Sequence, residues 1–173
     1  MRLIPIASIV MALAATAIAD GKAITDALTN INTQAEGLNS TVANWQGDLI
    51  GAIPITIKST QLLTQIKKAT KTASQSANLT MEEALAVAQA TGKLSETVQT
   101  TLQTIVNAKP KFDKLIILSP VVLLNLELQQ DATDEFSSAV VSKVPTDLRS
   151  LAQELIKPIN DAFAAAIDKY RLF

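Results

Sequence analysis

The amino-acid sequence predicts an all-α fold, an up-and-down bundle of four to five amphipathic helices preceded by an N-terminal signal peptide. Apolar residues recur in steps of three and four along most of the chain, which is the spacing of one face of a helix. Proline, glycine and a capping sequence separate these periodic segments. The 173 residues include no cysteine, so packing between helices rather than disulfides must hold the fold.

The first predicted helix carries one continuous apolar stripe. Its members are spaced by four and three and are Ile24, Leu28, Ile31, Ala35, Leu38, Val42, Trp45 and Leu49. A second helix is expected with Pro54 in its first turn, where the missing N–H of proline has no helical partner in any case. A third is expected to begin at the sequence Thr80-Met81-Glu82-Glu83. It has the form of a capping box, in which the Thr80 hydroxyl and the Glu83 carboxylate satisfy exposed N–H groups reciprocally.

The C-terminal third predicts two further helices. Pro110 is expected to begin a short apolar segment that precedes them. The pair Ser119-Pro120 has the form of an N-cap and a first-turn proline, which predicts a helix running to about Val144. A last helix is expected from Pro145 onward, with a kink at Pro158, because an internal proline removes one backbone hydrogen bond.

Residues 1–19 have the pattern of a secretory signal peptide. Arg2 supplies a short positive start, an apolar stretch covers residues 3–15, and Ala17-Ile18-Ala19 offers the small residues that precede cleavage. The apolar stretch is shorter than the roughly 20 residues that span a bilayer. The sequence therefore predicts cleavage after Ala19 and a single helical-bundle domain at residues 20–173, secreted and either extracellular or associated with a cell wall.

The absent residue types argue against most enzyme classes. Without cysteine or histidine, the chain has neither the usual zinc ligands nor the Ser-His and Cys-His pairs of nucleophilic catalysis. The formal net charge is −1, so no basic footprint indicates nucleic-acid binding. We therefore expect no catalytic residues, no cofactor and no metal.

The segment 115–128 is apolar nearly all round rather than along one stripe. One interpretation is a central helix buried on every side, as fully apolar helices usually are. The other is that part of this surface lines a cavity for an apolar ligand or is exposed when the bundle opens. Many stripe positions hold alanine, which either brings helices close together or leaves an elongated apolar space between them. The residues expected to line such a cavity are Leu102, Ile105, Leu115, Leu118, Val122, Leu126, Ile159 and Phe163.

Two sequons for N-glycosylation are present, at Asn39 and at Asn78. Asn78 is the better acceptor, because it is expected in the loop before the Thr80 cap. Asn39 is expected within the first helix, beside its apolar stripe. The alternative is a chance occurrence, since such triplets are frequent in a chain rich in Asn, Ser and Thr.

Several local features resemble one known family. The first helix opens with Ile24-Thr25-Asp26-Ala27-Leu28, Trp45 stands near its end, and Lys109-Pro110-Lys111-Phe112 precedes the apolar segment. In these features and in its overall pattern the chain resembles the fungal hydrophobic surface-binding protein A family, which includes cell wall galactomannoproteins. The resemblance covers residues 20–173. It implies a helical bundle that adsorbs to hydrophobic surfaces, and some members hold fatty acids in an internal apolar cavity.

The resemblance also shapes the expected setting and partners. The chain lacks the Ser/Thr-rich stalk and hydrophobic C-terminal tail of wall-anchored members, so free release or non-covalent wall association is expected. The leading hypothesis is a secreted, non-enzymatic protein that binds hydrophobic surfaces, fatty acids or other lipids. The alternative is a structural or adhesive cell wall mannoprotein without a specific small-molecule ligand. Cell wall polysaccharide and secreted hydrolases are further candidate partners.

Overall fold

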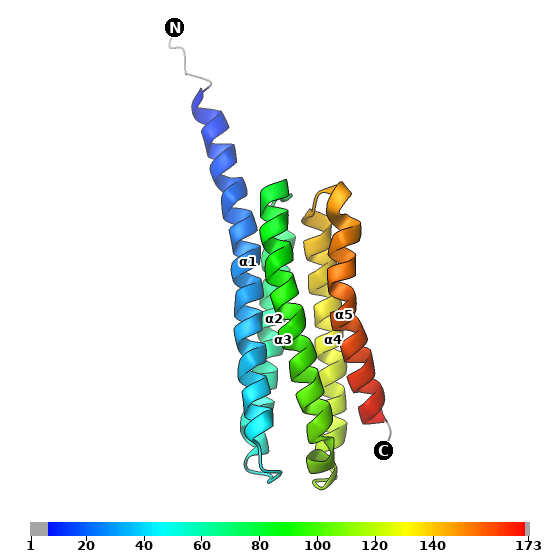
Figure 1. The fold of residues 1–173 in the computed structure, drawn as a ribbon. Coiled ribbons are helices and arrows are strands. Elements are labelled where there is room, and N and C mark those ends of the chain that lie inside the picture. The colour runs from blue at the N-terminus through cyan, green and yellow to red at the C-terminus, as the bar shows by residue number, and fades with distance from the viewer. Residues whose placement is uncertain (1–6, 172–173) are drawn as a thin grey trace.

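Five α-helices run alternately up and down in the computed structural model, which describes the backbone of residues 7–171 and the side chains of residues 20–171 (Figure 1). No strand occurs in this part of the chain, so the predicted all-α bundle is confirmed. A short 3₁₀ turn, η1, precedes the last helix. The helices are α1 (Ala7–Asn44), α2 (Ala52–Gln75), α3 (Met81–Asp113), α4 (Leu118–Lys143) and α5 (Arg149–Arg171), with η1 at Thr146–Leu148.

The helices close into a ring. Each packs mainly against two neighbours, in the order α1, α2, α4, α5, α3 and back to α1. With neighbouring axes about 9 Å apart, the axes of a five-membered ring lie about 7.7 Å from its centre, against about 6.4 Å for four helices. The centre of this bundle is therefore wider than that of a four-helix bundle and needs more side-chain volume to fill it.

The upper end of the bundle in Figure 1 is held by the expected capping box. The Glu83 N–H donates to the Thr80 hydroxyl at 3.3 Å, and the Thr80 N–H donates to Glu83 Oε2 at 2.8 Å. The backbone N–H of Gly21 donates to the other carboxylate oxygen at 3.3 Å, which ties α1 to the start of α3. Burial acts to raise the pKa of Glu83, but the hydrogen bonds from Thr80 and Gly21 outweigh it and the pKa is lowered.

The lower end is held by three aromatic residues from different elements. The Trp45 and Phe112 rings lie 4.4 Å apart, and Tyr170 packs edge-on against Phe112 at 6.3 Å. The Tyr170 hydroxyl donates to the Ile105 carbonyl at 2.8 Å, joining α5 to α3. Burial raises the pKa of Tyr170, so this hydroxyl stays a proton donor at any physiological pH.

The first helix ends earlier than the apolar stripe predicted. Gly47 adopts a positive φ of 93°, a conformation that suits glycine, and the Trp45 indole N–H donates to the Asp48 carbonyl at 2.8 Å. These contacts turn the chain after Asn44. Leu49, expected on the buried stripe, therefore lies in the loop between α1 and α2 and is exposed.

Two expectations about the connection between α3 and α4 are wrong. Pro110 does not begin a new segment but lies inside α3, in its last turns. Ser119 is not the N-cap of α4, because the helix begins at Leu118. The buried Ser119 hydroxyl instead donates to Asp113 Oδ1 at 2.6 Å, and the largely buried Lys109 ammonium donates to both oxygens of the same carboxylate at 2.8 and 2.9 Å. One carboxylate thus joins the end of α3 to the start of α4.

The interpretation of segment 115–128 as a helix buried on every side is also wrong. Ile116 is 84% exposed and Ile117 is 66% exposed, and Leu124 on α4 is exposed as well. Because α4 belongs to a ring rather than to its centre, it can bury only the face that looks inward. Leu126 on that inner face is buried.

The expected signal peptide, residues 1–19, lies outside the residues whose side chains are described. Its helical part, from Ala7, continues α1 past the upper ends of α2 and α3 (Figure 1). Over the described residues, no helix combines the length and apolar character needed to cross a bilayer.

We expect Asp113→Asn to lower the free energy of unfolding at neutral pH by about 1.5 kcal/mol, because the Lys109 ammonium loses charge-assisted hydrogen bonds. Those bonds, followed by the one from Ser119, hold the pKa of Asp113 below its ordinary value. The parent protein is therefore more stable than the variant above the unfolded-state pKa of about 3.9. This difference in the free energy of unfolding disappears as the pH falls through the lower folded-state pKa. Urea unfolding of both proteins from neutral to strongly acidic pH measures this difference.

The matched control is Asp161→Asn, which breaks a pair of the same spacing with Lys157. Both of its side chains are well exposed, so we expect a change of at most about 0.5 kcal/mol. Equal losses in the two variants, or an Asp113 effect that persists in strong acid, would contradict the stabilising role of the Asp113 carboxylate.

Candidate functional site

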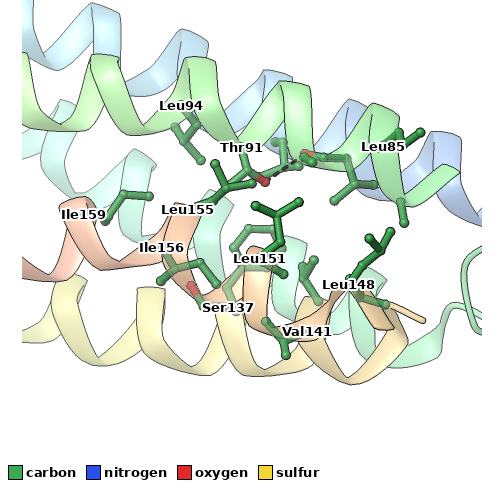
Figure 2. A pocket seen from close by; sticks show the side chains of 18 of the residues that line it. Leu85, Thr91, Leu94, Ser137, Val141, Leu148, Leu151, Leu155, Ile156 and Ile159 are labelled. Carbon is green, nitrogen blue, oxygen red and sulfur yellow. Dashed lines mark hydrogen bonds between the residues drawn. The ribbon is translucent and has the colours of Figure 1, made fainter. Parts of the chain in front are cut away.

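Three cavities lie one after another inside the ring of helices. The upper cavity has a volume of about 60 Å³ and lies between α3, α4 and α5. Figure 2 shows Leu85 and Leu94 of α3 facing Leu151 and Leu155 of α5 across it. Its lining is almost wholly apolar, with Thr91, Thr133 and Ser137 as the hydroxyl-bearing exceptions.

The central and lower cavities each measure about 40 Å³. All five helices contribute to the central cavity, from Ile31 on α1 to Phe163 on α5. The lower cavity lies mainly between α2 and α4, where Ile55 faces Leu118 and Leu126. A ring of five helices lined by aliphatic side chains thus leaves unfilled space along its axis.

Single layers of side chains separate the three cavities. Leu94, Phe136 and Ile159 line both the upper and the central cavity. Ile105 and Gln129, with Leu38, line both the central and the lower cavity. Rotation of these shared side chains, or a small separation of the helices that carry them, would join the cavities into one channel. Along α4 the row of cavities extends from Leu118 to Val144, about 39 Å at 1.5 Å per residue.

The lower cavity carries a polar group of side chains in its wall. The Ser59 hydroxyl donates to Asn125 Oδ1 at 3.1 Å and accepts a hydrogen bond from Gln129 Nε2 at 2.8 Å. Ser59 is 7% exposed and Gln129 is 6% exposed. The group therefore offers hydroxyl and amide dipoles to the inside of an otherwise apolar space.

The structure places seven of the eight predicted cavity residues in a cavity wall. Leu115 is the exception, because it lies in the turn between α3 and α4 and packs against the core without lining a cavity. The central cavity takes Leu102, Ile105, Ile159 and Phe163, and the lower cavity takes Leu118, Val122, Leu126 and again Ile105.

Sequence reasoning missed the upper cavity almost entirely. Of its lining, only Ile159 had been predicted. The available signal was the alternation of small and large residues on two helices that prove to be neighbours: Ala84 and Ala88 on α3, opposite Leu151 and Leu155 on α5. Periodicity alone did not show that these two faces meet.

The cavities are too small to hold a long apolar ligand as they stand. An engineered cavity that accepts benzene measures about 150 Å³. The largest of these three cavities is about 60 Å³. Binding of a long chain therefore requires the partitions between the cavities to move.

The two sequons lie in different surroundings. Asn78 is exposed in the loop between α2 and α3. Asn39 lies within α1, half-buried, and its Oδ1 has no hydrogen-bond partner. Only Asn78 presents its amide on an accessible, non-helical segment.

No arrangement of the described side chains resembles a metal site, since no three acidic residues come together in a suitable group. The pKa of Asp134 is raised by burial and by the nearby Asp131, but Asn160 donates a hydrogen bond that partly opposes this. Asp134 faces an open polar groove between α4 and α5, which shares Ser137, Val141 and Ile156 with the wall of the upper cavity.

Comparison with known proteins gives consistent results. A model of the family described as hydrophobic surface binding protein A matches residues 21–142. Cell wall mannoprotein 1 of Aspergillus flavus is 27% identical over 151 residues, which are 87% of this chain and 54% of the relative. Cell wall mannoprotein 1 of Aspergillus fumigatus is 26% identical over 146 residues, 83% of this chain and 50% of the relative. The chain spans about half the length of these curated relatives.

Solved structures share the fold closely. The crystal structure of AFMP4P in complex with palmitic acid matches with a TM-score of 0.83 and 26% identity, covering 87% of this chain and 99% of the other. Ligand binding domain 1 of the Penicillium marneffei MP1 protein, complexed with arachidonic acids, matches with a TM-score of 0.83, 19% identity and coverage of 87% and 98%. At that identity the second match supports the fold alone.

We expect Asn78→Gln, but not Asn39→Gln, to remove an N-linked glycan from the protein secreted by a eukaryotic host. The reason is that Asn78 is accessible in a loop while Asn39 is half-buried in a helix. Electrophoresis with and without an endoglycosidase measures the shift. A shift lost in the Asn39 variant and kept in the Asn78 variant would reverse this assignment.

Proposed function

The chain belongs to the hydrophobic surface-binding protein A family, and from that premise we propose that its bundle binds one fatty acid inside the ring of helices. The observation that carries this proposal is the row of three apolar cavities separated by single layers of side chains. The similar fold of AFMP4P, in complex with palmitic acid, supports a long acyl chain as the ligand.

Binding opens the partitions between the cavities. Each buried methylene contributes about 0.8 kcal/mol, so ten methylenes contribute about 8 kcal/mol toward displacing side chains such as Phe136 and Ile159. The row of cavities is longer than an extended sixteen-carbon chain. One ligand therefore occupies the central cavity and extends into at least one neighbouring cavity. The acyl chain supplies packing contacts that the alanine-rich interior lacks.

The carboxylate end of the ligand lies in the lower cavity. The Gln129 side-chain amide is the donor in its wall, because it gives one N–H to Ser59 and has a second N–H to offer, and a hydrogen bond to a charged group is worth about 1.5–3 kcal/mol. The upper cavity, by contrast, has no amide side chain in its wall but only the hydroxyls of Thr91, Thr133 and Ser137, and the Thr91 hydroxyl is engaged with the Val87 carbonyl of its own helix. The apolar end of the chain consequently points toward Phe136.

The protein acts outside the cell or at the cell wall, as a carrier or binder rather than an enzyme. The signal-peptide pattern of residues 1–19 and the similarity to cell wall mannoproteins support this setting. The lack of cysteine and histidine supports a role without catalysis. The alternative, a mannoprotein of purely structural role, predicts no affinity for fatty acids.

We expect Ala152→Phe to weaken palmitate binding about tenfold or more, equivalent to 1.4 kcal/mol, because the new ring fills the upper cavity into which the acyl chain extends. Displacement of a fluorescent fatty acid measures the affinity, and thermal unfolding shows that the variant is folded. The matched control is Ala164→Phe, an exposed position on the same helix, which should bind palmitate like the parent. Absence of palmitate binding by the parent protein would refute the proposed function.

We expect Gln129→Leu to weaken binding of palmitate about tenfold while leaving binding of methyl palmitate unchanged, because the loss of one charge-assisted hydrogen bond affects only the ionised ligand. The neighbouring Gln130→Leu lines no cavity and serves as the control. Equal losses for the acid and the ester would place the carboxylate elsewhere.

A further inference from the structure

Exposed apolar side chains gather at the lower end of the bundle. We define the lower apolar patch as Leu49, Ile50, Ile53, Ile57, Ile116 and Ile117, all at least half exposed. The first four come from the α1–α2 loop and the start of α2, and the last two from the α3–α4 turn. Both connections lie at the same end of the molecule (Figure 1), and the stacking of Trp45 on Phe112 holds them together.

Folding of the bundle does not require the exposed side chains of the patch. An exposed isoleucine adds nothing to the buried core, and scattered single cases need no explanation, but grouped ones mark an interaction surface. Of the large apolar side chains that are exposed among the described residues, those at the upper end are fewer: Met81, Leu85 and Leu151. Two of these three, Leu85 and Leu151, are rim residues of the upper cavity.

Lysines outnumber acidic residues beside the patch. The segments that carry it contain Lys58, Lys111 and Lys114 with Asp48, besides the buried Lys109 and its partner Asp113. Lys109 pairs with Asp113, and Asp48 accepts the Gly51 N–H in its own loop. The lower end is therefore net positive, although the whole chain has a formal net charge of −1.

The upper end has no such excess of positive charge. Glu82, Glu83 and Asp147 stand at the helix starts there, alongside Lys143 at the end of α4 and Arg149 at the start of α5, and Asp20 accepts the Ala77 N–H across from α1. An apolar surface with basic residues around it is typical of proteins that insert into the interface of an anionic membrane. The charge distribution thus distinguishes the two ends for such a partner.

The patch is also continuous with the lower cavity. Thr56 and Val121 line that cavity from α2 and α4, and both are exposed, so the mouth of the cavity opens between them. Ile57 and Ile53 lie beside Thr56 along α2, and Ile117 lies one turn before Val121. Whatever covers the patch therefore also covers the mouth of the cavity.

We propose that the lower end of the bundle docks on the surface of an anionic lipid bilayer, with the patch among the acyl chains and the lysines at the headgroups. The mouth of the lower cavity then faces the bilayer. Docking itself does not depend on the cargo, but the transfer of a fatty acid through this mouth rests on the proposed function. Each lysine near the anionic surface strengthens the attachment, in addition to the burial of the isoleucines.

Sedimentation of the full chain with vesicles tests the docking. One set of vesicles contains phosphatidylcholine and phosphatidylglycerol at three to one, and the other phosphatidylcholine alone. The test variant is Ile116→Ser with Ile117→Ser, whose wild-type side chains are too exposed to matter for folding. The matched control is Met81→Ser with Leu128→Ser, which removes two exposed apolar side chains that lie outside the patch and line none of the three cavities.

We expect the parent and the control to bind the anionic vesicles alike and the test variant to lose at least tenfold in affinity. High salt or the pair Lys58→Gln and Lys114→Gln should weaken binding to the anionic vesicles severalfold. Three results would each overturn the proposal. They are equal binding to both kinds of vesicle, equal losses of affinity in the test and control variants, and a dimer of the parent protein that the test variant no longer forms.

A measurement without vesicles separates this proposal from the proposed function. The test variant should bind palmitate in solution with the affinity of the parent, because none of the substituted residues lines a cavity. Its rate of palmitate uptake from anionic vesicles should fall by the same factor as its vesicle affinity. An unchanged uptake rate, despite normal palmitate affinity, would overturn the assignment of the lower mouth as the route.

Discussion

The structure depends on one packing constraint: five helices that close into a ring must fill a wider centre than four, and this chain fills it with small apolar side chains. The stripe of α1 contains Ala35, that of α2 contains Ala69 and Ala73, and all three alanines are almost fully buried. Such residues let neighbouring helices approach closely, but they do not reach the axis of the ring. The three cavities follow directly, because space that no side chain reaches stays open.

The two ends of the bundle compensate for this loose centre. At the upper end, Glu83 joins the start of α3 to Gly21 of α1, and at the lower end the Trp45, Phe112 and Tyr170 rings join three elements. Specific contacts are thus concentrated where the helices begin and end. A bundle fixed at its ends and thinly filled along its axis can separate its helices in the middle without unfolding, which is the motion that a long ligand inside it requires.

The sequence predicted the parts of the fold that depend on local spacing. The stripe from Ile24 to Val42 and the Thr80–Glu83 capping box needed only helical periodicity and hydrogen-bond chemistry, and both lie where they were expected. Ser119 was misassigned because its hydroxyl bonds to Asp113, a partner from the preceding helix that N-cap statistics do not consider. The upper cavity was missed because it depends on α3 and α5 being neighbours, and the order of helices around a ring is not encoded in the periodicity of any one of them. The exposure of Ile116 and Ile117 has a similar cause, since apolar character alone does not distinguish a buried side chain from a docking surface.

A crystal structure of this protein with palmitic acid would test most directly whether the space along the axis of the ring is the binding site. We predict one acyl chain running along that axis, with its carboxylate near Gln129 and its chain between Phe136 and Ile159. At least one of these two aromatic and aliphatic side chains should be rotated from its position in the present structure. A fatty acid bound only on the outer surface of the helices, with the three cavities still separate and empty, would contradict the central claim.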